Sequence, residues 1–297
     1  MRYHDQVISL DNSLRLTHGN PVGIASLLSL LHPAKSSFTA VLRPSSNSPI
    51  IVGQVARRAP EPSARLTFLM PSHLFPNPQL APLLDELSCH AAEMGAFCVL
   101  AELEENHLLF EDLRRSGFTV YAWQHIWKMP EIKSDFCHLW RPALEEDAFA
   151  VHNLYQSLVP PLIQGNEPSL PSRDTAWVHL YRDEVVAYAE ADYGLRGIYV
   201  RLIFHTDLDN NRELLEGLAG SLTSMGRPVY LSVRLYQSQL DRSLHDLGAT
   251  ESPLFAVMVK HLTSRLREQV LAKSRQRVET TQVETTSSMA RNTNLKE

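Results

Sequence analysis

The sequence predicts a mixed α/β protein made of two similar domains in tandem, each a twisted mixed sheet flanked by helices. Three observations support this prediction. The chain has 297 residues, whereas single hydrophobic cores stop growing near about 250–300 residues. Residues 79–129 align with residues 210–260 without a gap. In both segments, helical patterns alternate with short apolar runs of the kind that form buried strands.

The repeat consists mainly of leucines and glycines. Such positions vary least between copies of one backbone, because burial and left-handed turns restrict the choice of residue. A chance match between leucine-rich helices is the alternative explanation. The matching residues are Leu83, Leu84, Leu87, Met94, Gly95, Leu100, Leu109, Leu113, Gly117 and Thr119 in one segment, and Leu214, Leu215, Leu218, Met225, Gly226, Leu231, Leu240, Leu244, Gly248 and Thr250 in the other.

The first copy, residues 1–130, is predicted to contain a strand and a helix, then three strands, then helix, strand, helix and strand. Leu83, Leu84 and Leu87 follow helical spacing, and glycine closes each of the two later helices. The expected strands are 14–17, 38–42, 50–56, 64–69, 97–103 and 119–129, and the expected helices are 21–31, one around 83–91, and 107–115.

The second copy, residues 135–263, repeats this order after a linker at 130–136. The dipeptide Arg182-Asp183 predicts a tight turn between two of its strands. Residues 264–297 are expected to form a basic helical extension and a disordered tail. The expected strands are 137–141, 176–181, 184–191, 200–205, 229–235 and 254–261, and the expected helices are 145–158, one beginning near 212, and 237–247.

Composition narrows the possible functions. A net charge of −5 and a pI near 6.2 argue against a nucleic-acid partner. The apolar runs are far shorter than the roughly 20 residues of a membrane span, so we expect no membrane partner and a cytoplasmic protein. The three cysteines lack CxxC spacing, and no His/Cys cluster has the spacing of a metal site. P-loop, dinucleotide-binding and Ser/His/Asp motifs are also missing from the sequence.

The element order, with Gly117-Phe118 after the last helix of the first copy and a long strand beyond it, resembles the GNAT (general-control-related N-acetyltransferase) superfamily in tandem. The stretch 83–127 carries the resemblance most clearly. The resemblance implies acetyl-CoA as the cofactor, N-acyl transfer as the reaction, and a small-molecule or peptide amine as the acceptor. In this family the fourth and fifth strands separate, and the helix after the fourth strand points its N-terminus at the cofactor pyrophosphate.

The resemblance places any cofactor in the first copy. Where the family has a glycine-containing pyrophosphate loop, this copy has Asn77, Gln79, Leu80 and Ala81, of which only Ala81 fits the motif. The corresponding segment of the second copy, 206–211, is shorter and carries two aspartates that would repel a pyrophosphate.

Other departures from the family leave a second interpretation open. Leu113 and Leu244 stand where the family often has a general-acid tyrosine, so both copies lack this residue. The acceptor segment is longer in the second copy, at 159–175, than in the first, at 32–37. The alternative to an enzyme is therefore a catalytically inactive GNAT-like binding or scaffold protein.

Five residues are candidates for chemistry. Glu102 and Glu104 end a strand, where a carboxyl whose pKa is raised by burial could take a proton from the amine through water. Tyr121 could reach the thioester sulfur of the cofactor. Glu190 and Asp192 share one face of a strand and could hold a cationic amine. The alternatives are a solvated turn for the first pair, strand packing for the tyrosine and a surface-facing strand for the last pair.

Overall fold

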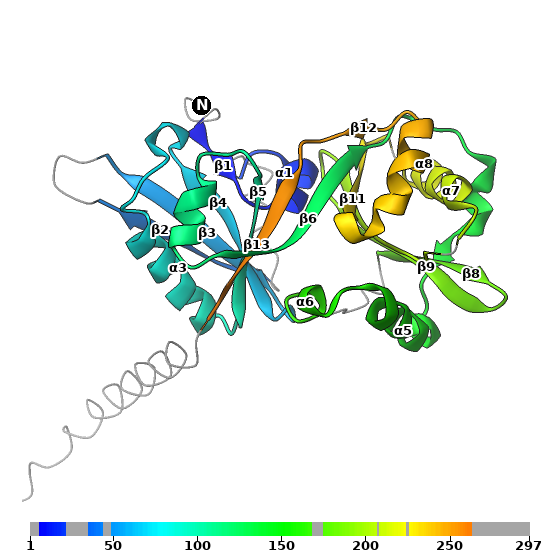
Figure 1. The fold of residues 1–297 in the computed structure, drawn as a ribbon, viewed down its shortest axis with the longest axis horizontal. Coiled ribbons are helices and arrows are strands. Elements are labelled where there is room, and N and C mark those ends of the chain that lie inside the picture. The colour runs from blue at the N-terminus through cyan, green and yellow to red at the C-terminus, as the bar shows by residue number, and fades with distance from the viewer. Residues whose placement is uncertain are drawn as a thin grey trace, which may run out of the picture.

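The computed structural model describes residues 6–21, 35–43, 49–167, 175–206, 208–223 and 226–262. Within these ranges it confirms the predicted fold class, a mixed α/β structure with the two copies side by side (Figure 1). Residues 22–31 of a predicted helix, Asp207 and the tail 264–297 lie outside the described residues. No described helix is long and apolar enough to span a bilayer.

The first copy follows the predicted order closely after its first strand and helix. Its elements are β1 (Ile8–Ser9), α1 (Asn12–His18), β2 (Lys35–Leu42), β3 (Ile51–Arg58), β4 (Ser63–Met70), the 3-10 turn η2 (Ser72–Leu74), α3 (Ala81–Glu93), β5 (Cys98–Glu104), α4 (Phe110–Arg115) and β6 (Thr119–Lys128).

The second copy begins with a 3-10 turn and ends with a long strand. Its elements are η3 (Asp135–Leu139), β7 (Arg141–Pro142), η4 (Glu145–Asp147), α5 (Ala148–Leu158), α6 (Pro161–Gln164), β8 (Ala176–Tyr181), β9 (Glu184–Tyr193), β10 (Ile198–Phe204), α7 (Asn211–Thr223), β11 (Val229–Arg234), η5 (Leu235–Leu240), α8 (Asp241–Asp246), β12 (Thr250–Glu251) and β13 (Phe255–His261).

The two copies share one 13-stranded sheet, in which the last strand of each copy pairs with the other copy. Strand β6 pairs with β11 of the second copy, and β13 pairs with β5 of the first. Between the copies, β6 and β13 also pair with each other and cross the middle of the molecule (Figure 1). The expected boundaries 1–130 and 135–263 therefore follow the chain, but the sheet does not divide at them. Among the described residues the strand order is β2-β3-β4-β5-β13-β6-β11-β10-β9-β8-β7, and the two remaining strands lie off this path, β1 paired with β4 and β12 paired with β6.

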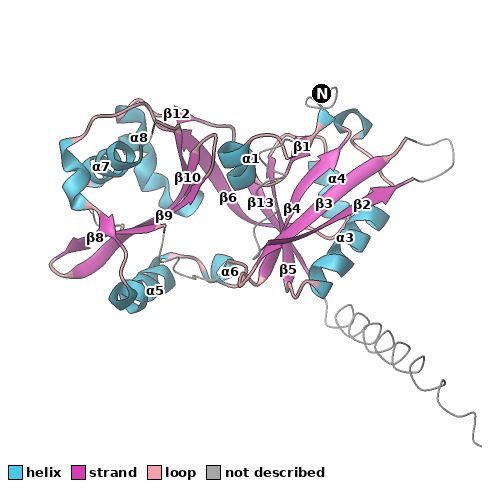
Figure 2. Ribbon diagram, turned by 180° about the vertical axis from the view of Figure 1, so that it is seen from behind, coloured by secondary structure: helices cyan, strands magenta, loops and turns pink. Residues whose placement is uncertain are grey.

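Apolar faces of the helices explain the layers around this sheet. Leu83, Leu84 and Leu87 of α3 are buried against the first copy, where burial of each leucine stabilises the fold by roughly 1.5–3 kcal/mol. Leu214 and Leu218 of α7 are buried in the corresponding cluster of the second copy. Helices α7 and α8 lie on one side of the second copy and α5 lies on the other (Figure 2).

Left-handed backbone positions coincide with residues predicted to close helices or turns. Gly95 and Gly226 have φ values of 86° and 68° after α3 and α7. Gly117 has a φ of 90° after α4, and Gly248 has 77° after α8. Glycine is favoured there because a Cβ is strained at such angles. The tight turn at 182–183 also has positive φ at both residues, as a two-residue hairpin turn requires.

Two predicted strands are wrong. Residues 14–17 belong to helix α1, because the Asp11 side chain accepts a hydrogen bond from the Leu14 amide at 3.0 Å and caps that helix. The alternating pattern of so short a run does not distinguish a strand from a helix, and the strand that pairs with β4 is β1. Residues 137–141 form the end of η3 and the start of β7, since the Ser134 hydroxyl accepts from the Phe136 amide and caps a 3-10 turn.

The ungapped alignment of the two copies is one residue out of register in one strand. Residues 64–69 resemble residues 200–205, so that Ala64 corresponds to Val200 and Arg65 to Arg201. Ala64 pairs with Val99, and Val200 pairs with Leu231, so Val99 rather than Leu100 corresponds to Leu231. By the same register, Glu102 corresponds to Arg234. The residues that face α3 or α7 agree with this shift: Val99, Ala101 and Leu103 in β5, and Val229, Leu231 and Val233 in β11.

Candidate functional site

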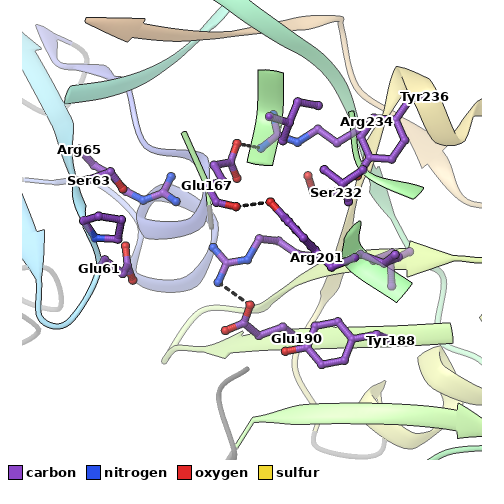
Figure 3. A pocket seen from close by; sticks show the side chains of 16 residues that line it. Glu61, Ser63, Arg65, Glu167, Tyr188, Glu190, Arg201, Ser232, Arg234 and Tyr236 are labelled. Atoms are coloured by element: carbon purple, nitrogen blue, oxygen red, sulfur yellow. Dashed lines mark hydrogen bonds and ion pairs between the residues drawn. The ribbon is translucent and has the colours of Figure 1, made fainter. Parts of the chain in front are cut away.

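A cavity of about 150 Å³ lies between the two copies (Figure 3). One wall comes from the start of β4 in the first copy, and the other walls come from α5, α6, β9, β10 and the end of β11. The segment around α6 is the longer acceptor segment noted in the sequence. The lining residues are Glu61, Pro62, Ser63, Arg65, Tyr155, Val159, Ile163, Glu167, Tyr188, Glu190, Arg201, Leu202, Ile203, Ser232, Arg234 and Tyr236.

Three arginines line this cavity, and each contacts a carboxylate. Arg234 Nη2 lies 2.6 Å from Glu167 Oε1. Arg201 Nη2 lies 3.2 Å from Glu190 Oε2 and 3.6 Å from Asp192 Oδ2. Arg65 Nη1 is 3.5 Å from Glu102 Oε1. Each side of the cavity therefore holds its own ion pairs. Because these pairs are partly buried, they interact more strongly than pairs at the surface.

The pairs shift the pKa values of their members. Burial alone would lower the pKa of Arg234, but Glu167 together with Tyr121 and Glu102 outweighs this effect and raises it. Burial alone would raise the pKa of Glu167, but Arg234 and Arg65 hold it below its ordinary value. For Asp192, Arg201 and a 2.8 Å hydrogen bond from the Ser13 hydroxyl likewise outweigh burial and lower the pKa. Glu167 and Asp192 are therefore carboxylates at neutral pH.

Tyr121 lies beside the cavity and supports Glu167. Its hydroxyl donates a hydrogen bond to the Glu167 carboxylate, while the hydroxyl of Tyr155 donates to the Glu167 backbone carbonyl. Burial and the charge of Glu167 raise the pKa of Tyr121, so the phenol keeps its proton. In this structure, Tyr121 orients a carboxylate of the cavity.

Glu102 is buried directly behind the cavity wall. Its carboxylate accepts hydrogen bonds from Gln124 Nε2 at 3.0 Å and from the Asn12 amide at 3.3 Å. Gln124 in turn accepts from the hydroxyl of Ser232, which lines the cavity. Burial raises the pKa of Glu102, the direction a general base needs. Glu104 is exposed at the end of β5 and is not brought to the cavity.

The structure brings the two predicted substrate residues together. Glu190 lines the cavity, and Asp192 lies two residues further along β9 on the same face. Both carboxylates contact Arg201, which corresponds to Arg65 of the first copy in the repeat. Neither residue lies on a bare surface strand.

The gap between the fourth and fifth strands of the first copy contains a piece of its own chain. Strands β4 and β5 pair only from Ser63 to Arg65, and beyond this point β1 lies against β4. The Leu10 amide donates to the Thr67 carbonyl at 2.9 Å, and the Leu10 carbonyl accepts from the Glu102 amide at 2.9 Å. Backbone from residues 8–10 therefore bridges the two separated strands.

The corresponding gap of the second copy contains a side chain instead. Strands β10 and β11 pair from Ile198 to Arg201 and then separate. Gln237 Nε2 donates to the Leu202 carbonyl at 3.1 Å, and Gln237 Oε1 accepts from the Phe204 amide at 3.2 Å. One carboxamide thus satisfies the two backbone groups that the separation of the strands leaves open, which matters because buried unpaired groups are costly.

The four predicted cofactor residues lie before and at the start of α3. The Asn77 amide donates to the buried carboxylate of Asp112 at 2.5 Å, and the Gln79 amide donates to the Asn77 side chain at 2.9 Å. Leu80 is buried, and Ala81 begins the helix. A carboxylate and an amide oxygen therefore already engage two donors of this loop. That the loop binds a cofactor stays a prediction.

The sequence interpretation missed Arg65, Arg201, Arg234, Glu167 and Gln237. The repeat itself aligned Arg65 with Arg201, and a charged residue at matching positions of two buried strands is a signal that could have found them. Gln237 and Glu167 lie in irregular segments, where no periodicity reports burial. Among the described residues, no group of His, Cys, Asp and Glu side chains is arranged to hold a metal ion.

Solved structures with similar architecture are GNAT proteins. A GCN5-related N-acetyltransferase from Sphaerobacter thermophilus has a TM-score of 0.46 at 12% identity, over 71% of this chain and 76% of that one. A tandem GNAT protein from the clavulanic acid biosynthesis pathway has a TM-score of 0.46 at 13% identity, over 81% and 88% of the chains. A GCN5-related N-acetyltransferase from Kribbella flavida has 0.46 at 15%, over 80% and 96%.

These likenesses concern the fold alone. No protein-family model matches the chain, and no curated protein sequence matches it.

Proposed function

We propose that the protein transfers an acyl group from acyl-CoA to an amine held in the central cavity, and that the second copy provides the cofactor site. The position of the cavity carries this proposal. It lies where β10 and β11 separate, since Leu202 and Ser232 line it, and the acceptor segment around α6 closes it from the other side. In the second copy, the gap between β10 and β11 that would take the acyl-CoA would therefore lie next to the pocket that would take the amine.

The fit of the cofactor differs between the copies. For a cofactor to enter the strand gap of the first copy, the backbone of residues 8–10 would have to leave the sheet. In the second, only the Gln237 side chain would have to rotate, and the Leu202 carbonyl and Phe204 amide that it releases suit the amide groups of a CoA arm. The start of α7 would face the pyrophosphate, although Asp209 adds an unfavourable charge nearby.

The chain's own carboxylates would handle the amine. Glu190 lines the cavity and would hold the protonated amine. Glu102, whose pKa burial raises, would take the proton through water before the nitrogen attacks the thioester carbonyl. The new C–N bond would replace the C–S bond of the acyl-CoA thioester, and the sulfur would leave as the thiol with the proton that the attacking nitrogen loses.

The second candidate is a catalytically inactive binding protein with the GNAT fold. The observation in its favour is that both strand gaps hold hydrogen-bonded groups of the chain itself, backbone in one and Gln237 in the other. Such a protein would keep the cavity as a ligand site and would have lost the cofactor site.

Calorimetry with acetyl-CoA separates these candidates. We expect binding to the native protein and about tenfold tighter binding to Gln237→Ala, because no side chain has to be displaced, while Ala81→Glu leaves affinity unchanged. Ser238→Ala, at an exposed neighbour of Gln237, is the matched control. No heat from the native protein or from Gln237→Ala at millimolar acetyl-CoA would favour the inactive binding protein. Loss of binding in Ala81→Glu would place the cofactor in the first copy.

A further inference from the structure

More carboxylates than arginines surround the central cavity. Its lining includes three arginines and three glutamates. Two further carboxylates, Glu102 and Asp192, contact Arg65 and Arg201 from behind the wall, and one further arginine, Arg58, contacts Asp192 at 3.7 Å, which leaves five carboxylates against four arginines. An excess of carboxylates disfavours a polyanion and favours a ligand that carries positive charge.

The wall from the first copy carries one arginine and one glutamate that could each bind a charged group of a ligand. Arg65 makes one ion pair among the described residues, the 3.5 Å contact with Glu102, although a guanidinium has five N–H donors. The side chain of Arg65 is 21% exposed and lines the cavity. Glu61 also lines the cavity; its charge helps to raise the pKa values of Arg65 and Arg201, but it makes no ion-pair contact within 4.0 Å with any described residue. Figure 3 shows these two residues on one wall, opposite Arg201, Glu190 and Arg234.

The opposite wall carries ion pairs of its own. Arg201 is shared by Glu190 and Asp192, and Arg234 contacts Glu167, although Arg234 Nη1 is buried without a hydrogen-bond partner among the described residues. The lining also includes three tyrosines and several aliphatic side chains, which suit a short hydrocarbon stem. They are Tyr155, Val159, Ile163, Tyr188, Ile203 and Tyr236.

We propose that this cavity binds a small basic α-amino acid, one with a carboxylate and two amines. The carboxylate would be held by the free donors of Arg65, the α-ammonium by Glu61, and the distal ammonium by Glu190 on the opposite wall, with the hydrocarbon stem against the apolar lining. A cavity of about 150 Å³ suits a molecule of this size. The inference names the acceptor class of the proposed acyl transfer, and it applies equally to an inactive binding protein.

The test is calorimetry without acyl-CoA, using L-lysine and two analogues that each lack one group. Cadaverine lacks the carboxylate, and 6-aminohexanoate lacks the α-amine. We expect L-lysine to bind at least tenfold more tightly than either analogue. Arg65→Gln should remove the advantage of L-lysine over cadaverine, and Glu61→Gln should remove its advantage over 6-aminohexanoate.

Controls keep the result interpretable. Glu104→Gln, at an exposed carboxylate outside the cavity, should bind L-lysine as the native protein does. Circular dichroism reports whether each variant folds, and if Arg65→Gln does not, the ligand series on the native protein and Glu61→Gln still decide. Equal affinity for all three ligands, or tighter binding of either analogue than of L-lysine, would overturn the proposal. This experiment contains no acyl-CoA, so its result does not depend on whether the protein transfers an acyl group.

Discussion

The two copies fill the same strand gap by different means. In the first, the backbone of residues 8–10 bridges β4 and β5 and leads directly into helix α1. In the second, the carboxamide of Gln237, which follows β11 in the chain, makes two hydrogen bonds to the backbone of β10 where that strand separates from β11. A backbone bridge can leave only if a segment of the fold moves, whereas a side chain can leave by rotating about its own bonds. The first gap is therefore closed by backbone that belongs to the sheet, and the second by a side chain that can rotate away.

Leu10→Ala should have the largest effect on stability. The Leu10 side chain is 1% exposed within the core of the first copy. Truncation would leave a void there, so we expect a loss of about 3 kcal/mol in the free energy of unfolding, measured by urea denaturation. Leu16→Ala, at a half-buried position of α1, should cost clearly less. A cost below 1 kcal/mol would show that the first gap is closed as loosely as the second.

Glu167→Gln should have an intermediate effect that depends on pH. At pH 7 the variant loses a charge beside Arg234 and should be less stable by roughly 2 kcal/mol. The folded pKa of Glu167 is below its ordinary value of 4.5, so its contribution is fully present above that value and is lost as pH falls through the folded pKa. Thermal unfolding at pH 7 and pH 3 should show the gap between native and variant narrowing. A constant difference would contradict an ionised Glu167.

Gln237→Ala should have the smallest effect on stability. The substitution leaves the Leu202 carbonyl and the Phe204 amide without their partner, but the adjoining cavity lets water replace the carboxamide. We expect a loss of about 1 kcal/mol by urea denaturation. A loss equal to that of Leu10→Ala would mean that Gln237 is a structural part of the sheet, and the contrast between the gaps would fall.

The sequence predicts the fold better than the site, for physical reasons. Glycines such as Gly95 and Gly226 report left-handed turns directly, and the leucines of α3 and α7 report one buried face, so the order of elements is readable. Strand pairing between distant segments leaves no such mark, and nothing in 255–261 indicates that β13 pairs with β5. The short run 14–17 was misassigned because its pattern fits both states.

The site was only partly predictable because its residues are charged. Glu102, Tyr121, Glu190 and Asp192 were found from their places at strand ends, and the structure puts them in or beside the cavity. The buried arginines were overlooked, since a charged residue in a strand suggests exposure unless its partner is known. For Arg234, that partner is Glu167, which lies outside regular secondary structure.

The exchange of β6 and β13 also affects how the chain can fold. Strand β5 ends at Glu104, yet its neighbour in the sheet begins at Phe255. During synthesis from the N-terminus, the first copy therefore leaves the ribosome with an open sheet edge that only the last strand of the second copy can cover. Such distant pairing slows folding, and cutting the chain between the copies would leave each half with a strand whose partner is on the other fragment. We therefore expect the two copies to fold as one unit rather than separately.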